Sequence, residues 1–281
     1  MNTTPQMIKE TTMKDHWIVP LALVLISCPT WLTLTTSPTL FAIPAAIFGI
    51  WYFHRAGHWF LAGLLTAICL FRPEFLPFMI VPGLILGRFF YLGGLAVSGI
   101  AVYFAAQFMH LDINLSALMA AAVTGPANMM QNFAGILTLL LGENASNLSV
   151  AVWAIYGITL ACVTELWWRM KDQSISQNKY LKKCAGTILM MLLAAPHTYA
   201  QDYVAFIPVA IWLWNATKND SRSNATTIRR MIFAFPLVSW LFYFAAPTFV
   251  MLRIPPYFIW ALALSLVLLP TLDDERVVSA K

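Results

Sequence analysis

The chain has 281 residues, of which 60% are hydrophobic and only 10% are charged, and its formal net charge is +5. A soluble domain normally carries roughly a quarter charged residues, so this composition excludes an ordinary soluble globular protein. Apolar runs recur from Trp17 to Pro270. Because they are continuous rather than alternating, they predict membrane-spanning helices instead of a β-barrel.

We therefore expect an all-α, polytopic membrane helix bundle of about ten helices, two pairs of which form short outward-pointing hairpins. One membrane domain, residues 17–270, lies between a cytoplasmic amino-terminal tail, 1–16, and a cytoplasmic carboxy-terminal tail, 271–281. The expected helices cover residues 17–36, 39–54, 59–71, 75–90, 91–109, 149–168, 184–196, 203–214, 231–247 and 257–270.

The positions of lysine and arginine predict the topology. If the amino terminus is cytoplasmic and the helices alternate, only Arg72 and Arg253 of the 17 basic residues face outward. This asymmetry is typical of a multi-pass protein, here of the plasma (inner) membrane, and the net charge does not indicate nucleic acid as a partner. The longest outer segment is 110–148, where a moderately apolar stretch predicts an interfacial helix.

Two expected helices, 59–71 and 184–196, have about thirteen residues each, which gives roughly 20 Å of length against a hydrocarbon core of about 30 Å. Pro73 and Pro196 mark their outer ends, since proline cannot continue a helix. Polar backbone at membrane depth is tolerated only inside protein or along a water-filled cavity. The segments 72–74 and 196–202 are therefore predicted to line a recessed polar cavity.

Arg72 and Glu74 have two interpretations at this stage. They form a structural ion pair, with Glu74 stabilising a helix start, or Arg72 binds a phosphate, which its planar guanidinium fits. His197 is either a hydrogen-bonded structural residue or a phosphate contact and acid–base group. Asp202 either caps the helix that begins at Tyr203 or takes part in chemistry.

Amides in the outer segments add candidates for binding sugar hydroxyl groups, although they fit helix capping equally well. These side chains are Gln131, Asn132 and Gln201, with Tyr199 beside the last. Asp112 and Glu143 are most simply solvated charges. The sequence shows no phosphate-binding glycine loop, zinc spacing or nucleophile elbow, so no cofactor and no divalent metal are expected. The cysteines are interpreted as small apolar residues: Cys28, Cys69, Cys162 and Cys184.

Three motifs in order resemble glycosyltransferase family 87, over roughly residues 20–270 and apparently its carboxy-terminal part. The first is Leu61–Leu65 with Phe71-Arg72-Pro73-Glu74 and then Gly87-Arg88. The second is Met130–Gly135 with Leu139–Gly142. The third is Ala195–Tyr203, which runs into Ile207-Pro208.

The resemblance implies a GT-C transferase that moves a sugar, typically mannose, from a polyprenyl-phosphate donor to a glycolipid or polysaccharide acceptor on the outer face. Arg72, in place of the family's lysine, would contact the donor phosphate together with His197. Glu74, Asp202 and His197 are the catalytic candidates. The sugar or acceptor would meet Gln131, Asn132, Tyr199 and Gln201.

One departure from the family keeps other functions open. The first outer loop is Ser37-Pro38 and lacks the carboxylate expected there. Three explanations are open. Glu74, Asp112 or Asp202 takes the place of that carboxylate, a partner chain supplies the missing amino-terminal helices, or the chain is inactive. A lipid-linked sugar transporter or flippase and a non-catalytic membrane subunit are the alternatives. The lipid bilayer is a partner in each case.

Overall fold

The computed structural model describes residues 18–86, 89–108, 129–142, 147–169, 177–252 and 254–271. Within these ranges every regular element is a helix, and a single antiparallel bridge joins Met130 to Tyr199. The all-α prediction is confirmed. The predictions for Arg88, Asp112, Glu143 and Arg253 concern positions outside the described residues.

α-Helices and short 3-10 helices (η) follow one another with brief breaks. In chain order they are α1 (Ile18–Leu25), α2 (Cys28–Thr36), η1 (Pro38–Phe41), α3 (Ala42–Arg55), α4 (Trp59–Thr66), η2 (Ala67–Phe71), η3 (Pro73–Phe75), α5 (Leu76–Ile85), α6 (Phe89–Phe108), α8 (Phe133–Leu141), α9 (Leu148–Trp168), α10 (Gln177–Ala194), η5 (Ala200–Ala205), α11 (Phe206–Thr217), α12 (Ser223–Phe244), α13 (Ala246–Met251), α14 (Pro256–Leu268) and η6 (Leu269–Thr271).

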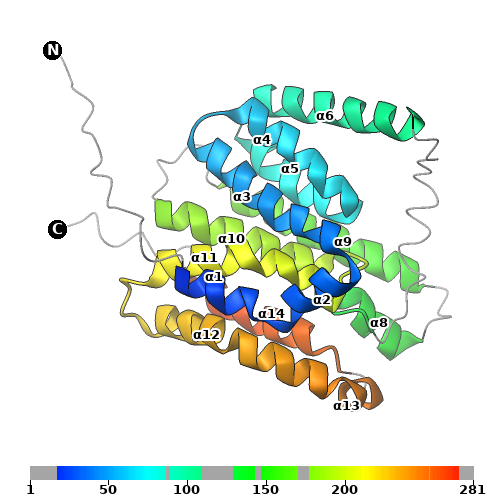
Figure 1. The fold of residues 1–281 in the computed structure, drawn as a ribbon, viewed down its shortest axis with the longest axis vertical. Coiled ribbons are helices and arrows are strands. Elements are labelled where there is room, and N and C mark those ends of the chain that lie inside the picture. The colour runs from blue at the N-terminus through cyan, green and yellow to red at the C-terminus, as the bar shows by residue number, and fades with distance from the viewer. Residues whose placement is uncertain are drawn as a thin grey trace.

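The core of the bundle lies around α10 and α11, which pack against each other along their length. Every residue of α11 from Phe206 to Leu213 is buried, as expected for a helix that is apolar all round. Figure 1 shows these two helices in the middle of the molecule, with α12 along one edge and α6 along the other. The site described below is built on the segment that joins α10 to α11.

A close crossing of α4 and α6 fixes the α6 edge of the bundle. A Cβ atom added to Gly63 would overlap the carbonyl oxygen of Tyr91, and one added to Gly94 would overlap that of Phe60. Glycine at such positions lets two helix backbones touch. The Tyr91 hydroxyl also pairs with Thr66 Oγ1 at 2.7 Å, so the crossing is tied by side chains as well.

Three predicted helices, 17–36, 184–196 and 231–247, differ clearly from the observed ones, and the last is observed as α12, which begins at Ser223 and ends at Phe244. The helix predicted at 184–196 begins at Gln177, so it is not short, and it includes Lys182 and Lys183, which are buried. Lysine stems are apolar enough to pack inside a bundle, and Lys183 Nζ donates to the carbonyl oxygen of Leu166 at 2.9 Å, in the last turn of α9. The other short helix is confirmed, since α4 and η2 together span 59–71.

The first predicted span, 17–36, is broken into α1 and α2, which are bent by 58° relative to each other. The hydroxyl groups of Ser27 and Thr30 donate hydrogen bonds to the carbonyl oxygen of Val24, at 2.6 and 2.7 Å. Pro29 lies in the first turn of α2. Proline at a first turn and side-chain bonds to the backbone both favour such a break. Part of segment 110–148 forms the helix expected there, α8.

Among the described helices, α9 is long and apolar enough to cross a bilayer, and the bent pair α1–α2 also qualifies if it is counted as one span.

Candidate functional site

Arg72 lies between two carboxylates that the sequence analysis had singled out. Its Nη2 is 2.7 Å from Asp202 Oδ1, and its Nη1 is 3.9 Å from Glu74 Oε1. The side chain of Asp202 is 0% exposed, that of Glu74 11% and that of Arg72 19%. Arg72 therefore forms an ion pair, but its close partner is Asp202, and the expected partner Glu74 is a looser one.

Local backbone chemistry places these groups. Arg72 has a non-helical conformation (φ −137°, ψ 80°) between η2 and η3, as expected of a residue that precedes proline. Asp202 is in the first turn of η5, where its Oδ2 accepts the backbone N–H of Tyr199 at 2.8 Å. This is the capping role that the sequence predicted for Asp202. The helix that it caps is η5, however, and not one that begins at Tyr203.

Burial raises the pKa of Asp202 to about 6, although the Arg72 guanidinium and the Tyr199 N–H oppose the rise, and nearby Glu74 adds to it. Loss of hydration disfavours the charged form of a buried carboxyl group. The charge of Asp202 therefore depends on Arg72. Arg72 in turn keeps a buried Nε without a hydrogen-bond partner, so its guanidinium is only partly satisfied by the two carboxylates.

The segment 130–132 runs beside the turn that carries Asp202. The Gln131 N–H donates to the carbonyl oxygen of Thr198 at 2.7 Å, and the Tyr203 hydroxyl donates to the carbonyl oxygen of Gln131 at 2.9 Å. Asn132 caps α8 by accepting the Gly135 N–H at 2.8 Å, while its Nδ2 donates to the carbonyl oxygen of Ala195. The amide of Asn132 thus caps α8 and also links the two segments. This agrees with the capping role expected as the alternative to sugar binding.

A cavity of about 440 Å³ adjoins this turn; we call it the Tyr199 cavity. Three predicted residues line it: Gln131, Tyr199 and Gln201. The Oε1 of Gln131 accepts the Tyr257 N–H at 3.1 Å, so one end of that amide is already used. The remaining wall comes from Leu32, Met129, Ala200, Phe242, Tyr243, Ala246, Phe249, Ile254, Pro256 and Tyr257.

Tyr199 joins the charged cluster to the cavity. Its ring lines the cavity, and burial raises the pKa of its hydroxyl, which also senses the charges of Arg72, Asp202 and Glu74. His197 is partly exposed on the same turn but is not among the described residues that line the cavity. The site therefore has a charged part and an aromatic part, with Tyr199 between them.

The aromatic wall of the cavity was not predicted from the sequence. Phe242, Tyr243 and Phe249 come from α12 and α13, and Tyr257 from the start of α14. Aromatic residues at the ends of predicted spans are typical of interfacial anchors. Their recurrence at the adjoining ends of three consecutive segments was the signal that they also face a common space.

No known protein family, curated protein or solved structure matches this chain. What the site can do follows from its own groups. The partly exposed Arg72 guanidinium, whose Nη1 is held only loosely by Glu74, offers a contact to an anion. The two carboxylates offer proton acceptors, and the cavity offers mostly apolar contacts. Within the described ranges, no group of three His, Cys, Asp or Glu side chains is placed to hold a metal ion.

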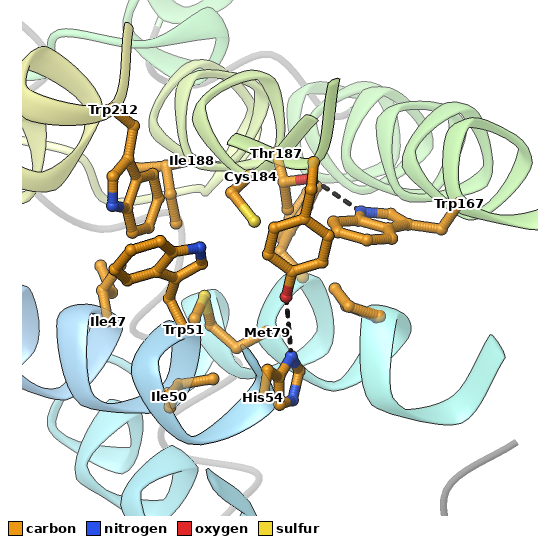
Figure 2. A pocket seen from close by; sticks show the side chains of 13 residues that line it. Ile47, Ile50, Trp51, His54, Met79, Trp167, Cys184, Thr187, Ile188 and Trp212 are labelled. Atoms are coloured by element: carbon orange, nitrogen blue, oxygen red, sulfur yellow. Dashed lines mark hydrogen bonds between the residues drawn. The ribbon is translucent and has the colours of Figure 1, made fainter. Parts of the chain in front are cut away.

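A second cavity, the tryptophan pocket, lies elsewhere in the bundle and measures only about 30 Å³. Figure 2 shows Trp51 and Trp212 on one side of it and Trp167 on the other, with a hydrogen bond from Trp167 Nε1 to Thr187 Oγ1 of 2.9 Å. The indole N–H groups of Trp51 and Trp212 are buried without hydrogen-bond partners. Its volume suits a water molecule and not a substrate.

Proposed function

We propose that the chain is a multi-pass membrane glycosyltransferase of the GT-C type, or the carboxy-terminal part of one. It would move a sugar, mannose by resemblance, from a polyprenyl-phosphate donor to a glycolipid or polysaccharide acceptor on the outer face. The observation that carries this proposal is the convergence of separate segments on one site. The Arg72–Asp202 ion pair and the Gln131–Thr198 hydrogen bond join the Arg72 turn of the first motif to the second and third motifs, beside the Tyr199 cavity.

Exposed apolar side chains support the multi-pass membrane location. On α6, Phe89 is 84% exposed and Phe108 88%, and on α12 Leu237 is 77% exposed. Large apolar side chains are also exposed on α1, α2, α9 and α14. Large contiguous apolar surfaces are unusual in monomeric soluble proteins and fit contact with lipid. We place the protein in the plasma (inner) membrane with both termini in the cytoplasm, as the distribution of basic residues predicts.

The geometry ranks the roles of the charged residues. A donor phosphate that approaches Arg72 would replace Glu74, whose contact at 3.9 Å is loose, and not Asp202 at 2.7 Å. Asp202 then positions Arg72, since both of its oxygens are engaged. Glu74 is freed to act as the general base, and His197, on the neighbouring turn, is a second contact for the phosphate.

In the proposed reaction, the Glu74 carboxylate takes the proton of an acceptor hydroxyl group. The hydroxyl oxygen forms a bond to the anomeric carbon of the sugar, and the bond between that carbon and the phosphate oxygen breaks. The lipid phosphate leaves with the electron pair, and Arg72 stabilises the charge that develops on it. Tyr199 and Gln201 would orient the sugar or acceptor from the cavity wall.

Sugar transfer from a radiolabelled polyprenyl-phosphate-mannose donor, by purified protein in lipid, tests this proposal. Arg72→Ala and Glu74→Gln should each lower the transfer rate by about 100-fold or more, the size expected for a lost charge contact or base. Asp202→Asn and His197→Ala should have smaller effects. Glu165→Gln is the matched control. Glu165 also pairs with an arginine, but its side chain is 57% exposed and it lies in the last turn of α9. Transfer that is unchanged in Arg72→Ala would refute the proposal.

A non-catalytic membrane subunit is the second candidate. The engagement of both Asp202 oxygens favours it, since this leaves Glu74 as the one loosely held carboxylate of the described cluster. In that case the purified chain binds the donor through Arg72 without transferring sugar, and transfer appears only when a partner chain is added.

A further inference from the structure

Residues 218–230, which we call the basic segment, join α11 to α12 and carry excess positive charge. The segment contains four basic residues and one acidic residue. The acidic residue is Asp220, whose Oδ2 is 2.6 Å from Nη2 of Arg222. Lys218 and Arg230 are exposed, and within the described ranges no carboxylate forms an ion pair with either of them. The segment therefore presents cations that its own carboxylate does not neutralise.

Contacts to α10 and α11 hold the basic segment in place. The Arg229 guanidinium donates to the carbonyl oxygens of Thr217 and Asp220, which ties the start of α12 to the end of α11. Hydrogen bonds from Arg222, with Lys182 of α10 among the smaller causes, lower the pKa of Asp220 to about 2. Asp220 is therefore ionised at neutral pH, and the excess of positive charge remains after its charge is counted.

An apolar stripe begins next to this charge on the outer face of α12. Because α12 begins at Ser223, Arg230 lies on the helix and not in a loop. Four side chains, each 60% exposed or more, follow it at intervals of three or four residues: Phe233, Leu237, Leu241 and Phe244. Residues with this spacing share one face of a helix. Half of a hydrocarbon core of about 30 Å is about 15 Å, which reaches from Arg230 to about Leu241 at 1.5 Å per residue.

The exposed face of α9 ends differently. Its arginine, Arg169, has Nε 2.8 Å from Oε1 of Glu165 on the same helix. The positive charge at that end of α9 is therefore compensated within the helix, and lipid that contacts α9 has no electrostatic reason to be anionic. On α12, which lies along one edge of the molecule (Figure 1), the exposed apolar stripe ends at cations that the described carboxylates leave uncompensated.

We propose that the outer face of α12 binds an anionic phospholipid of the cytoplasmic leaflet, with its phosphate at Lys218 and Arg230 and an acyl chain along the stripe. Basic clusters on the cytoplasmic side of a membrane protein attract anionic headgroups, and a guanidinium fits phosphate oxygens. The Tyr199 cavity is lined by Phe242 and Tyr243 from the other end of α12. The lipid site is thus separate from the proposed donor site, and it rests only on the membrane location proposed above.

Native mass spectrometry of the full chain in detergent tests this inference. It compares the affinities of phosphatidylglycerol and phosphatidylcholine that have the same acyl chains. The double variant Lys218→Gln with Arg230→Gln removes the two cations. Arg169→Gln is the matched control, because Arg169 is also exposed but already has a carboxylate partner. A phosphatidylglycerol with a diazirine on its acyl chain then maps the contact by photo-crosslinking in lipid.

We expect phosphatidylglycerol to bind wild type about tenfold more tightly than phosphatidylcholine. The double variant should lose this preference while it still binds phosphatidylcholine, which shows that it is folded, and Arg169→Gln should keep the preference. Crosslinks should lie on α12 between residues 230 and 244. Equal affinities in wild type, a preference that survives in the double variant, or crosslinks spread evenly over α6 and α9 would overturn the inference.

Sugar transfer measured on the same preparations separates this inference from the proposed enzyme. A preference for phosphatidylglycerol without transfer refutes only the enzyme. Transfer without that preference refutes only the lipid site.

Discussion

The Tyr199 cavity and the tryptophan pocket are both lined by aromatic rings, yet they differ in volume and in the state of their polar atoms. The first measures about 440 Å³ and adjoins an ion pair, a capped turn and a bridge between two segments. The second measures about 30 Å³ and contains two indole N–H groups with no hydrogen-bond partner. Aromatic lining alone therefore does not indicate a binding site; volume and an organised charged neighbour distinguish the two.

The largest expected effect tests whether the charged cluster holds the first region together. Arg72→Ala leaves the carboxylate of Asp202 buried without its partner, and we expect a loss of about 3–5 kcal/mol in unfolding free energy at pH 8. Arg222→Ala, which removes the more exposed ion pair with Asp220, should cost less than about 1 kcal/mol. Chemical unfolding in lipid measures both. Equal effects would show that Arg72 does not support the cavity.

The pH dependence of stability sharpens the same point. Because the pKa of folded Asp202 is raised from its ordinary 3.8 to about 6, the folded state holds this proton more tightly than the unfolded state. Its contribution is therefore fully present below pH 4 and is lost as the pH rises through 6. The stability of wild type minus that of Asp202→Asn should fall by roughly 3 kcal/mol from pH 3 to pH 7. A flat difference would contradict the raised pKa.

The capping residue of α8 should have a moderate effect. Asn132→Ala removes the cap at Gly135 and the hydrogen bond to Ala195, and we expect a loss of about 1–2 kcal/mol with weaker ligand binding at the cavity. Asn224→Ala, on the exposed start of α12, is the control and should change stability little. Normal binding in Asn132→Ala would show that the 130–132 segment does not shape the site.

The smallest effects should come from the tryptophan pocket. Trp167→Phe breaks the hydrogen bond to Thr187, whereas Trp51→Phe and Trp212→Phe remove N–H groups that have no hydrogen-bond partner. All three lose similar packing, so Trp167→Phe should be about 1 kcal/mol more destabilising than either of the others. If Trp51→Phe were as costly as Trp167→Phe, the Trp51 N–H would have a partner, such as a bound water.

Much of the helical pattern was predictable because long apolar runs have few alternatives. The predicted 149–168 and the observed Leu148–Trp168 differ by one residue. The start of α10 was not predictable, because the charges of Lys182 and Lys183 indicate a cytoplasmic loop. The structure shows that both side chains are buried, and Lys183 contacts α9. The bend at Ser27 was signalled by Pro29, but its size depends on hydroxyl contacts that the sequence does not specify.

The sequence predicted one polar cavity lined by segments 72–74 and 196–202, but only the second segment lines the Tyr199 cavity, whose wall is mostly apolar. Arg72, Glu74, Tyr199, Gln201 and Asp202 were selected from proline-bounded turns, and the structure does bring them together. That Asp202 pairs more closely with Arg72 than Glu74 does could not be read from the sequence, since it depends on the register between two turns far apart in the chain. The aromatic wall required knowing that α12, α13 and the start of α14 contribute to one cavity beside η5.

The glycine contacts of α4 and α6 also have a consequence for finding relatives of this chain. Gly63 and Gly94 each touch the backbone of the opposite helix, so even one methyl group at either position would force the helices apart. Most exposed apolar positions can exchange one apolar residue for another, so their identities drift. A distant homologue that keeps this edge of the bundle is therefore more recognisable by these two glycines than by its overall similarity.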